Sequence, residues 1–544
     1  MDFLTRNLWA IGLGVIAVVV VAATALRATA DDKAPTDKPA VLDGKFFKVE
    51  DAKSTGSVST SSGGFVSYDA VAGTLVVHAK DWDDVPQPAD KKDKDDDSNP
   101  NAEASMFYAA YFKKGADPHT RPITFVYNGG PGSATVWLHM GAFGPKRVVT
   151  IDGAHTPAAP YNLVNNDSTL LDVSDLVFID APGAGFSRIA GKDKEKAFFG
   201  IDEDANAFAE FIMQFLSKYG RWNSPKYLFG ESYGTTRSAV LVNLLETQKA
   251  VDFNGVILLS QILNFDLSPD GPYTNPGVDL PYQLALPTYA ASAWYHHKSG
   301  SKAKDLPALL HEVQTWAMGP YAQALQAGGI LTQAQRLQVA NKLHYFTGLP
   351  VSYILKADLR IDGGEFEKNL QDDVGYTTGR LDTRFSGPTM DPLSKEADYD
   401  PQSAAISSAY VSAFNDYVRK DLKFNQTRGF RLFADTSKWN FQHQPPNANY
   451  PVTAAANVMP DLATAMKYNP SLKVMLNAGY YDLATPFYEG VYEMRHLQIP
   501  PKLQANIRYQ FYESGHMVYA NTDSLKQLHD HVADFIRGTD NQHH

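Results

Sequence analysis

Short apolar runs alternate with helical stretches along much of the chain from residue 105 onward. Apolar runs typical of buried strands lie at 107–112, 123–127, 176–179, 227–229 and 256–259, and again at 474–477 and 507–511. Helical periodicity is found at 203–218, 235–247 and 523–536. This alternation predicts βαβ units and a mostly parallel sheet, which is an α/β fold.

A long helix-rich segment interrupts this pattern. Between about 264 and 471 the chain is rich in proline and aromatic residues, and Thr332 with Gln335 forms the signature of a helix capping box. We therefore expect a cap insertion at 264–471 between the two parts of one sheet-bearing domain, 105–263 and 472–544.

The amino-terminal segment 1–30 has the features of an export signal. Arg6 precedes an uncharged run at 8–26, and Ala28-Thr-Ala30 offers a small-residue cleavage site. The run is also about long enough to span a bilayer, so an uncleaved anchor stays open. In both cases we expect an exported protein, periplasmic or secreted, that contacts a membrane only if the segment is retained.

The segment 31–104 is polar and punctuated by small residues. We expect an extended or disordered leader to about residue 64, then a hairpin formed by 65–68 and 74–77. The charge run Lys91–Asp97 predicts a solvated acidic loop, because like charges repel and extend a chain.

Composition excludes several classes of function. The net charge of −11 and the absence of a basic stripe argue against a nucleic-acid partner. With no cysteine, the chain has neither disulfides nor thiolate metal sites, which favours a bacterial envelope while remaining compatible with a eukaryotic secretory route. Three histidine clusters, at 296–297, 529–531 and 543–544, lack the carboxylates of a metal frame, so neither a metal nor another cofactor is predicted.

The sequence Gly230-Glu-Ser232-Tyr-Gly234 lies between a predicted strand and a predicted helix. This context is typical of a nucleophile elbow, in which glycines allow a tight turn that exposes the serine hydroxyl. Asp482 and His516 each follow a later predicted strand, and the order Ser, Asp, His is that of α/β-hydrolases. We predict a catalytic triad of Ser232, Asp482 and His516.

A glycine-rich loop follows the strand at 123–127 and reads Asn128-Gly-Gly-Pro-Gly-Ser133. The bare backbone at Gly129 and Gly130 can approach a substrate closely. Backbone N–H groups stabilise an oxyanion without reorganisation, and we expect Gly130 and Tyr233 to supply them.

At these motifs the chain resembles the serine carboxypeptidase family. The matching stretches are 128–133 running to Gly144-Pro145, 176–187, 230–234, 479–482 and 515–517. The resemblance implies an α/β-hydrolase fold with a large helical cap, and an exported carboxypeptidase that cleaves peptides through an acyl-enzyme. It also implies that Asn128 and Glu231 hold the terminal carboxylate of the substrate, and that Met517 lines the leaving-residue pocket.

One position departs from the family pattern. The family's second carboxylate-recognising Glu, two residues before the Gly-Pro, is replaced here by Ala142. Without a carboxyl that shares its proton, Glu231 is expected to ionise more readily than its family counterparts, and a cation would then have to hold the peptide carboxylate. His139, Arg380 and Arg384 are the candidates for substrate binding.

The replacement of the family's Glu by Ala142 leaves two other functions open. An acyltransferase or esterase would keep the same machinery, and a binding protein without catalysis would keep only the fold.

Overall fold

The computed structural model describes residues 43–61, 63–84, 100–424, 427–449, 451 and 455–542. All of these lie in the compact unit Val41–His544. The predicted signal at 1–30, the acidic loop Lys91–Asp97 and the histidines 543–544 lie outside the described residues. Within the described ranges, no helix has both the length and the apolar character needed to cross a membrane.

One large twisted sheet organises the molecule. Its strand order is β1-β2-β3-β7-β4-β9-β10-β13-β14, with the short β8 also pairing with β3. The strands are β1 (Asp51–Ser59), β2 (Phe65–His78), β3 (Glu103–Lys113), β4 (Ile123–Tyr127), β7 (Asp175–Ile179), β8 (Arg188–Ala190), β9 (Lys226–Glu231), β10 (Gly255–Leu259), β13 (Lys473–Gly479) and β14 (Ile507–Tyr512). Two small antiparallel pairs lie apart from it: β5 (Lys146–Val148) with β6 (Leu163–Asn165), and β11 (Tyr376–Thr378) with β12 (Ser386–Pro388).

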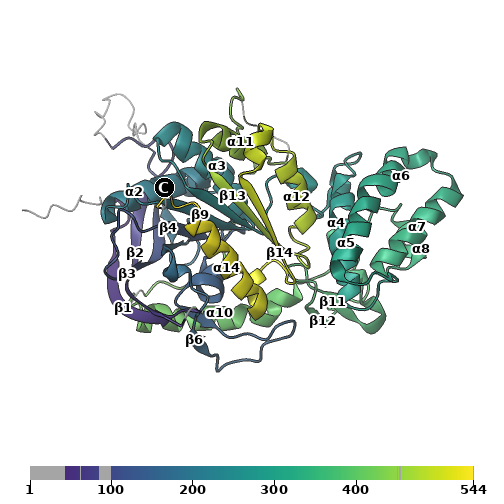
Figure 1. Cartoon of the computed structure of the whole chain (residues 1–544), viewed down its shortest axis with the longest axis horizontal. Coiled ribbons are helices and arrows are strands. Elements are labelled where there is room, and N and C mark those ends of the chain that lie inside the picture. Colours follow the sequence, from purple (N-terminus) through teal and green to yellow (C-terminus); the bar gives the residue numbers. More distant parts are fainter. Residues whose placement is uncertain are drawn as a thin grey trace, which may run out of the picture. The chain divides into compact units, whose positions relative to one another are not determined.

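The six strands from β7 to β14 in this order run parallel, whereas β1, β2 and β3 are antiparallel. β4, β7, β9 and β10 are buried along their whole length, which explains their continuous apolar runs, since helices cover both faces of a parallel sheet. The strand order and the crossover helices are those of the α/β-hydrolase fold, as predicted (Figure 1).

The helices of the sheet domain pack into the same core as the strands. They are α1 (Lys194–Phe198), α2 (Ile201–Tyr219), α3 (Tyr233–Lys249), α10 (Pro401–Lys420), α11 (Met459–Tyr468), α12 (Phe487–Arg495), α13 (Pro501–Gln504) and α14 (Thr522–Arg537). α3 contacts both α2 and α11, whereas α14 packs on β14.

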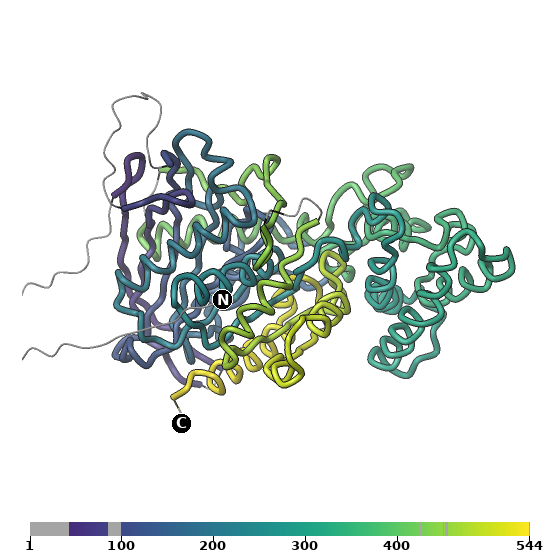
Figure 2. Tube along the Cα trace, turned by 90° about the horizontal axis from the view of Figure 1, so that it is seen from above, coloured from purple at the N-terminus to yellow at the C-terminus, as the bar shows by residue number. Residues whose placement is uncertain are grey.

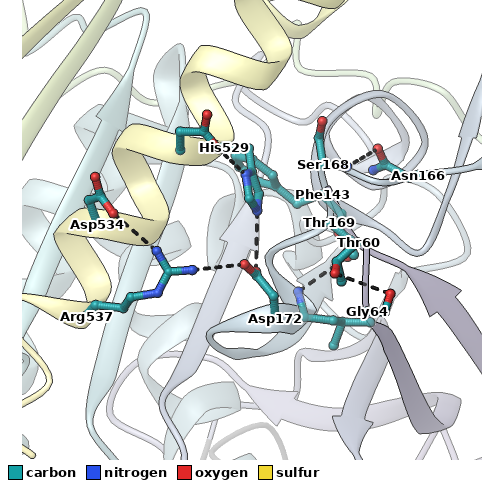
Figure 3. Close-up of polar contacts among 12 residues, drawn as sticks. Thr60, Gly64, Phe143, Asn166, Ser168, Thr169, Asp172, His529, Asp534 and Arg537 are labelled. Carbon is teal, nitrogen blue, oxygen red and sulfur yellow. Dashed lines mark hydrogen bonds and ion pairs between the residues drawn. The ribbon is translucent and has the colours of Figure 1, made fainter. Parts of the chain in front are cut away.

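Ion pairs fasten α14 to the loop before β7. Asp172, in the short helix η2 (Leu170–Asp172), accepts from His529 Nε2 at 3.4 Å and from Arg537 Nη2 at 3.1 Å (Figure 3). His529, from the histidine cluster at 529–531, is buried in this contact.

Part of the predicted insertion 264–471 has a hydrophobic core of its own, centred on residues 282–370. Its helices are α4 (Leu280–Tyr295), α5 (Leu306–Trp316), α6 (Ala322–Ala327), α7 (Gln333–Thr347), α8 (Val351–Lys356) and α9 (Gly363–Asn369). α4 to α8 form one group in Figures 1 and 2. The predicted capping box at Thr332 is present at the start of α7. By contrast, α10 and α11 contribute side chains to the main core, so the insertion is divided between two cores.

The amino-terminal part of the described chain differs from expectation. Residues 51–59 form β1 rather than an extended leader, and 65–78 form one continuous strand rather than a hairpin. Asp69–Gly73, which resembled a turn, is held straight because β1 and β3 pair with it on both sides. The hairpin is formed by β1 and β2, with Ser59 opposite Phe65.

Candidate active site

Ser232 occupies a sharp turn between β9 and α3. Its backbone has φ 60° and ψ −130°, and its N–H donates to the carbonyl of Leu259 at 3.0 Å. A Cβ at Gly230 would collide with the carbonyl of Gly234, so the turn requires glycine there. The half-buried Ser232 is thus placed at the carboxyl end of the central strand.

Asp482 and His516 lie beside one another on loops that follow β13 and β14. His516 Nδ1 and Asp482 Oδ2 are 2.9 Å apart. Asp482 is fully buried and also accepts hydrogen bonds from the Thr485 hydroxyl at 2.7 Å and the Thr485 N–H at 3.0 Å. These contacts fix the carboxylate, which in turn orients the imidazole.

Burial of His516 lowers its pKa, but the adjacent Asp482 and then Glu231 outweigh that effect and raise it above the ordinary value. Within the described part of the chain, no hydrogen bond joins the Ser232 hydroxyl to His516. Such bonds are often long before substrate binds, so a nucleophile and a base are still compatible with this arrangement.

The glycine-rich loop after β4 lies directly against the elbow. A Cβ at Gly129 would collide with the backbone nitrogen of Tyr233, and Gly130 has φ 109°, in the region that favours glycine. Tyr233 is the first residue of α3, where an N–H has no partner within the helix. Both backbone groups predicted for the oxyanion therefore belong to segments that meet beside Ser232.

Asn128 and Glu231 are joined, as their predicted shared role requires. Asn128 Nδ2 donates to Glu231 Oε1 at 2.9 Å, while Asn128 Oδ1 accepts from the N–H of Leu138 at 3.1 Å. Burial raises the pKa of Glu231 to about 7, although His516, Tyr519 and Asn128 each lower it. Burial therefore disfavours the charged form of Glu231 even without a second carboxyl.

A buried ion pair that sequence reasoning missed supports this loop. Arg237 of α3 donates to both oxygens of Asp204 in α2, at 2.6 and 3.2 Å, and its Nη1 donates to the carbonyl of Asn128 at 2.8 Å. The sequence signal for this ion pair was Arg237 itself, a charged residue within a largely apolar stretch of α3.

The segment Gly379–Phe385 lies between the Asp482 and His516 loops. Leu483 N–H donates to the Arg380 carbonyl at 3.1 Å, Thr383 N–H donates to the Tyr481 carbonyl at 2.9 Å, and His516 N–H donates to the Leu381 carbonyl at 2.6 Å. We call 379–385 the bridging segment, because its backbone contacts both the loop that carries Asp482 and the loop that carries His516.

The two arginines of the bridging segment are already paired. Arg384 is buried and contacts Asp382 and Asp152, and Asp382 Oδ2 also accepts from the N–H of Gly515 at 3.1 Å. Arg380, whose side chain is 38% exposed, forms an ion pair with Asp270. Neither side chain is free to serve as the expected cation.

His139 lies in the core rather than facing a substrate. Its Nε2 is 2.6 Å from the hydroxyl of Tyr111, and its ring stacks on Phe178 with centroids 4.3 Å apart. Burial lowers the pKa of His139 to about 3, so it is neutral at working pH. Met517, directly after His516, is buried as a pocket-lining residue can be.

A segment that we call the crossing segment, 430–443, runs along the glycine-rich loop after β4. Ala434 N–H donates to the Gly132 carbonyl at 2.8 Å, and Ala134 N–H donates to the Leu432 carbonyl at 2.9 Å. The segment ends at the buried His443, whose nitrogens lie 2.7 Å from Asp202 and 2.8 Å from Asp461. Nothing in the sequence around His443 pointed to this position.

The described residues contain no group of three or more His, Asp or Glu side chains that could hold a metal ion. His296, from the histidine cluster at 296–297, is half-buried, and its Nε2 lies 2.6 Å from the carbonyl oxygen of Thr383.

Part of the chain matches the model of a known protein family. Residues 97–271 match the family model described as "Serine carboxypeptidase". A similar curated protein is "Serine carboxypeptidase-like 36" of Arabidopsis thaliana, 27% identical over 183 residues, which are 32% of this chain. The match spans 35% of the plant protein, about a third of its length.

Two solved structures illustrate more distant likenesses. A proline iminopeptidase from Mycobacterium smegmatis is 13% identical, with a TM-score of 0.35 over 80% of this chain and 96% of that one. A carboxyl esterase from Bacillus coagulans is 12% identical, with a TM-score of 0.33 over 86% and 99% of the two chains.

The matched family region contains the glycine-rich loop, Glu231, Ser232 and Tyr233, which together form one side of the site described above. Residues 97–271 therefore resemble the serine carboxypeptidase family, a likeness that indicates a serine hydrolase.

Proposed function

We propose that this protein is a serine-type carboxypeptidase that removes residues from the carboxyl terminus of peptides. The proposal rests on a half-buried serine at the elbow, a buried Asp482–His516 pair, and a buried Asn128–Glu231 pair whose Glu231 directly precedes that serine. The first three residues provide covalent chemistry, and the last two provide polar groups for a terminal carboxylate.

The reaction uses Ser232 as nucleophile. His516 Nε2 takes the hydroxyl proton while Oγ attacks the scissile carbonyl carbon, and Asp482 holds the imidazole through Nδ1. The N–H groups of Gly130 and Tyr233 stabilise the oxyanion. His516 then gives its proton to the leaving amine, and a water molecule hydrolyses the acyl-enzyme with His516 again as base.

Replacing Ser232 with alanine tests this chemistry. We expect turnover to fall by about 10⁴-fold or more, since the oxyanion hole and binding alone leave only residual catalysis. Labelling by a fluorophosphonate should occur in the wild type and disappear in the variant. Equal hydrolysis by both proteins would refute the proposal, and an unlabelled wild type would support a binding protein without catalysis.

Ala142 favours a second candidate, an acyltransferase or esterase built on the same site. Mass spectrometry of N-blocked peptides after incubation separates the two. Loss of single carboxyl-terminal residues supports the carboxypeptidase. Transfer of an acyl group to an added alcohol, with peptides left intact, supports the alternative.

Export is a separate part of the proposal, supported by the pattern of residues 1–30, which lie outside the described structure. Protein made in its native host should begin at Asp31. A product that retains Met1 and sediments with membranes would instead support an uncleaved anchor.

A further inference from the structure

Two buried polar atoms beside the nucleophile have no hydrogen-bond partner among the described residues. They are Oε2 of Glu231 and the hydroxyl of Tyr519, and both residues are only 3% exposed. The other oxygen of Glu231 is held by Asn128 at 2.9 Å. Buried polar groups are rarely left unpaired, and those that are call for an explanation such as a ligand.

Tyr519 lies close enough to Glu231 for each to change the pKa of the other. Tyr519 lowers the pKa of Glu231, and the charge of Glu231, after burial itself, raises that of Tyr519. The two groups are therefore neighbours, although they lack the geometry of a good hydrogen bond with each other. Tyr410 of α10 is a further neighbour, since after burial the charge of Glu231 also raises its pKa.

The two tyrosines pack against Gly141, the residue that precedes Ala142. Gly141 and Ala142 lie in η1 (Leu138–Phe143), and a Cβ at Gly141 would meet the hydroxyl of Tyr410 at 2.5 Å and the ring of Tyr519 at 2.7 Å. Glycine at 141 therefore allows both tyrosines to pack on η1, one residue away from the position of the family's second acid.

We propose that Tyr519, with Tyr410 beside it, is a specificity-determining residue for the terminal carboxylate of a peptide. In the complex the Tyr519 hydroxyl donates to that carboxylate, next to Asn128 and the protonated Glu231. The inference rests on the proposed carboxypeptidase function and adds the residue that replaces the missing acid. No additional cation is required, which agrees with the pairing of Arg380 and Arg384 and the burial of His139.

A phenol differs from a carboxyl in the pH range over which it donates. Burial and the neighbouring charge hold the pKa of Tyr519 well above its ordinary value, so the hydroxyl stays protonated throughout the working range. Recognition of the carboxylate therefore depends on the titration of one carboxyl, Glu231, rather than on a pair that shares a proton.

The test uses Tyr519→Phe and Tyr410→Phe in the full chain, with Tyr227→Phe as the matched control. Tyr227 is also a buried phenol of the sheet domain, but its hydroxyl contacts Thr539 at 2.9 Å, at the opposite end of β9 from Glu231. The measurement is kcat/KM for an N-blocked dipeptide and for its carboxyl-terminal amide. Fluorophosphonate labelling of Ser232 in each variant shows that the site has folded.

We expect Tyr519→Phe to lose about 10- to 100-fold of the wild-type preference for the free carboxylate over the amide, as for a hydrogen bond to a charged group. The loss should lie mainly in KM for the acid, whereas Tyr227→Phe keeps the wild-type ratio. A labelled Tyr519→Phe protein with an unchanged ratio overturns the role of Tyr519 alone. A wild type with no preference for the carboxylate overturns this inference and the carboxypeptidase proposal together.

Discussion

At the scale of single residues, Glu231 and His516 are the two groups that set the working pH. Burial raises the pKa of Glu231 to about 7, and Asp482 and Glu231 raise that of His516 despite its burial. The other titratable groups around Glu231 are Asp482, Tyr410 and Tyr519. Glu231 raises the pKa of His516, and His516 lowers that of Glu231.

We predict a narrow bell-shaped pH profile of kcat/KM for peptides. The acid limb reports loss of the neutral His516 that acts as base, and the alkaline limb reports ionisation of Glu231, which then repels the peptide carboxylate. Glu231→Gln should remove the alkaline limb, because an amide stays a donor. It should also move the acid limb to lower pH, because the negative charge that favours protonated His516 is gone. An alkaline limb that is unchanged in Glu231→Gln would show that another group produces it.

The sequence predicted the residues that follow strands better than those that meet across the fold. Ser232, Asp482 and His516 each occupy a loop directly after an apolar run, so local pattern and chain order placed them. Tyr410 touches Gly141 only because α10 packs on η1, and no local pattern shows that contact. The raised pKa of Glu231 could not be predicted from the sequence, because burial, its largest cause, is a property of the folded chain.

At the scale of elements, the bridging segment 379–385 connects the loop that carries Asp482 to the loop that carries His516. Its side chains add a buried ion pair to the backbone contacts, with Arg384 Nη2 2.6 Å from Asp382 Oδ2. The sequence pattern places this segment in the cap and predicts that Arg380 or Arg384 faces the peptide carboxylate. Its position between two loops follows from tertiary packing, which a local pattern does not contain.

We predict that Arg384→Ala lowers both stability and turnover. It leaves the fully buried carboxylate of Asp382 without its main partner, which typically costs about 3–5 kcal/mol. Since Asp382 also accepts from Gly515, the His516 loop should shift and kcat should fall. Thermal unfolding and steady-state kinetics measure the two effects.

Lys298→Ala provides the control, because Lys298 pairs with Asp373 at the surface of the same insertion. An exposed pair of this kind contributes at most about 1 kcal/mol. If Arg384→Ala behaves like Lys298→Ala in both measurements, the bridging segment does not position the site.

At the scale of the whole molecule, the crossing segment 430–443 joins distant parts of the sheet domain. His443 contacts Asp202 at the start of α2 and Asp461 in α11, and its side chain is 3% exposed. Burial lowers the pKa of His443, but the hydrogen bonds and charges of both carboxylates outweigh it and raise the pKa to about 9.

We predict that His443 stabilises the fold below about pH 6.5 and that this contribution is lost as pH rises through about 9, since its pKa is higher in the folded state. The loss is on the order of 3–4 kcal/mol at about 1.4 kcal/mol per pKa unit. Apparent Tm should therefore fall between pH 6.5 and 9.5 in the wild type and fall less in His443→Gln. The exposed His155 supplies the control, and a His443→Gln curve parallel to that of His155→Gln would rule out the linkage.

The order of strands also determines when activity can arise during synthesis. β10 and β13 are adjacent in the sheet, with Gly255 opposite Lys473, yet the whole insertion is made between them. A ribosome that has completed the elbow has therefore produced Ser232 without its base, and His516 follows only with the last helix still to come. Under the proposed mechanism, a nascent chain carries a nucleophile without its base, so a chain released early would be unable to cleave its neighbours.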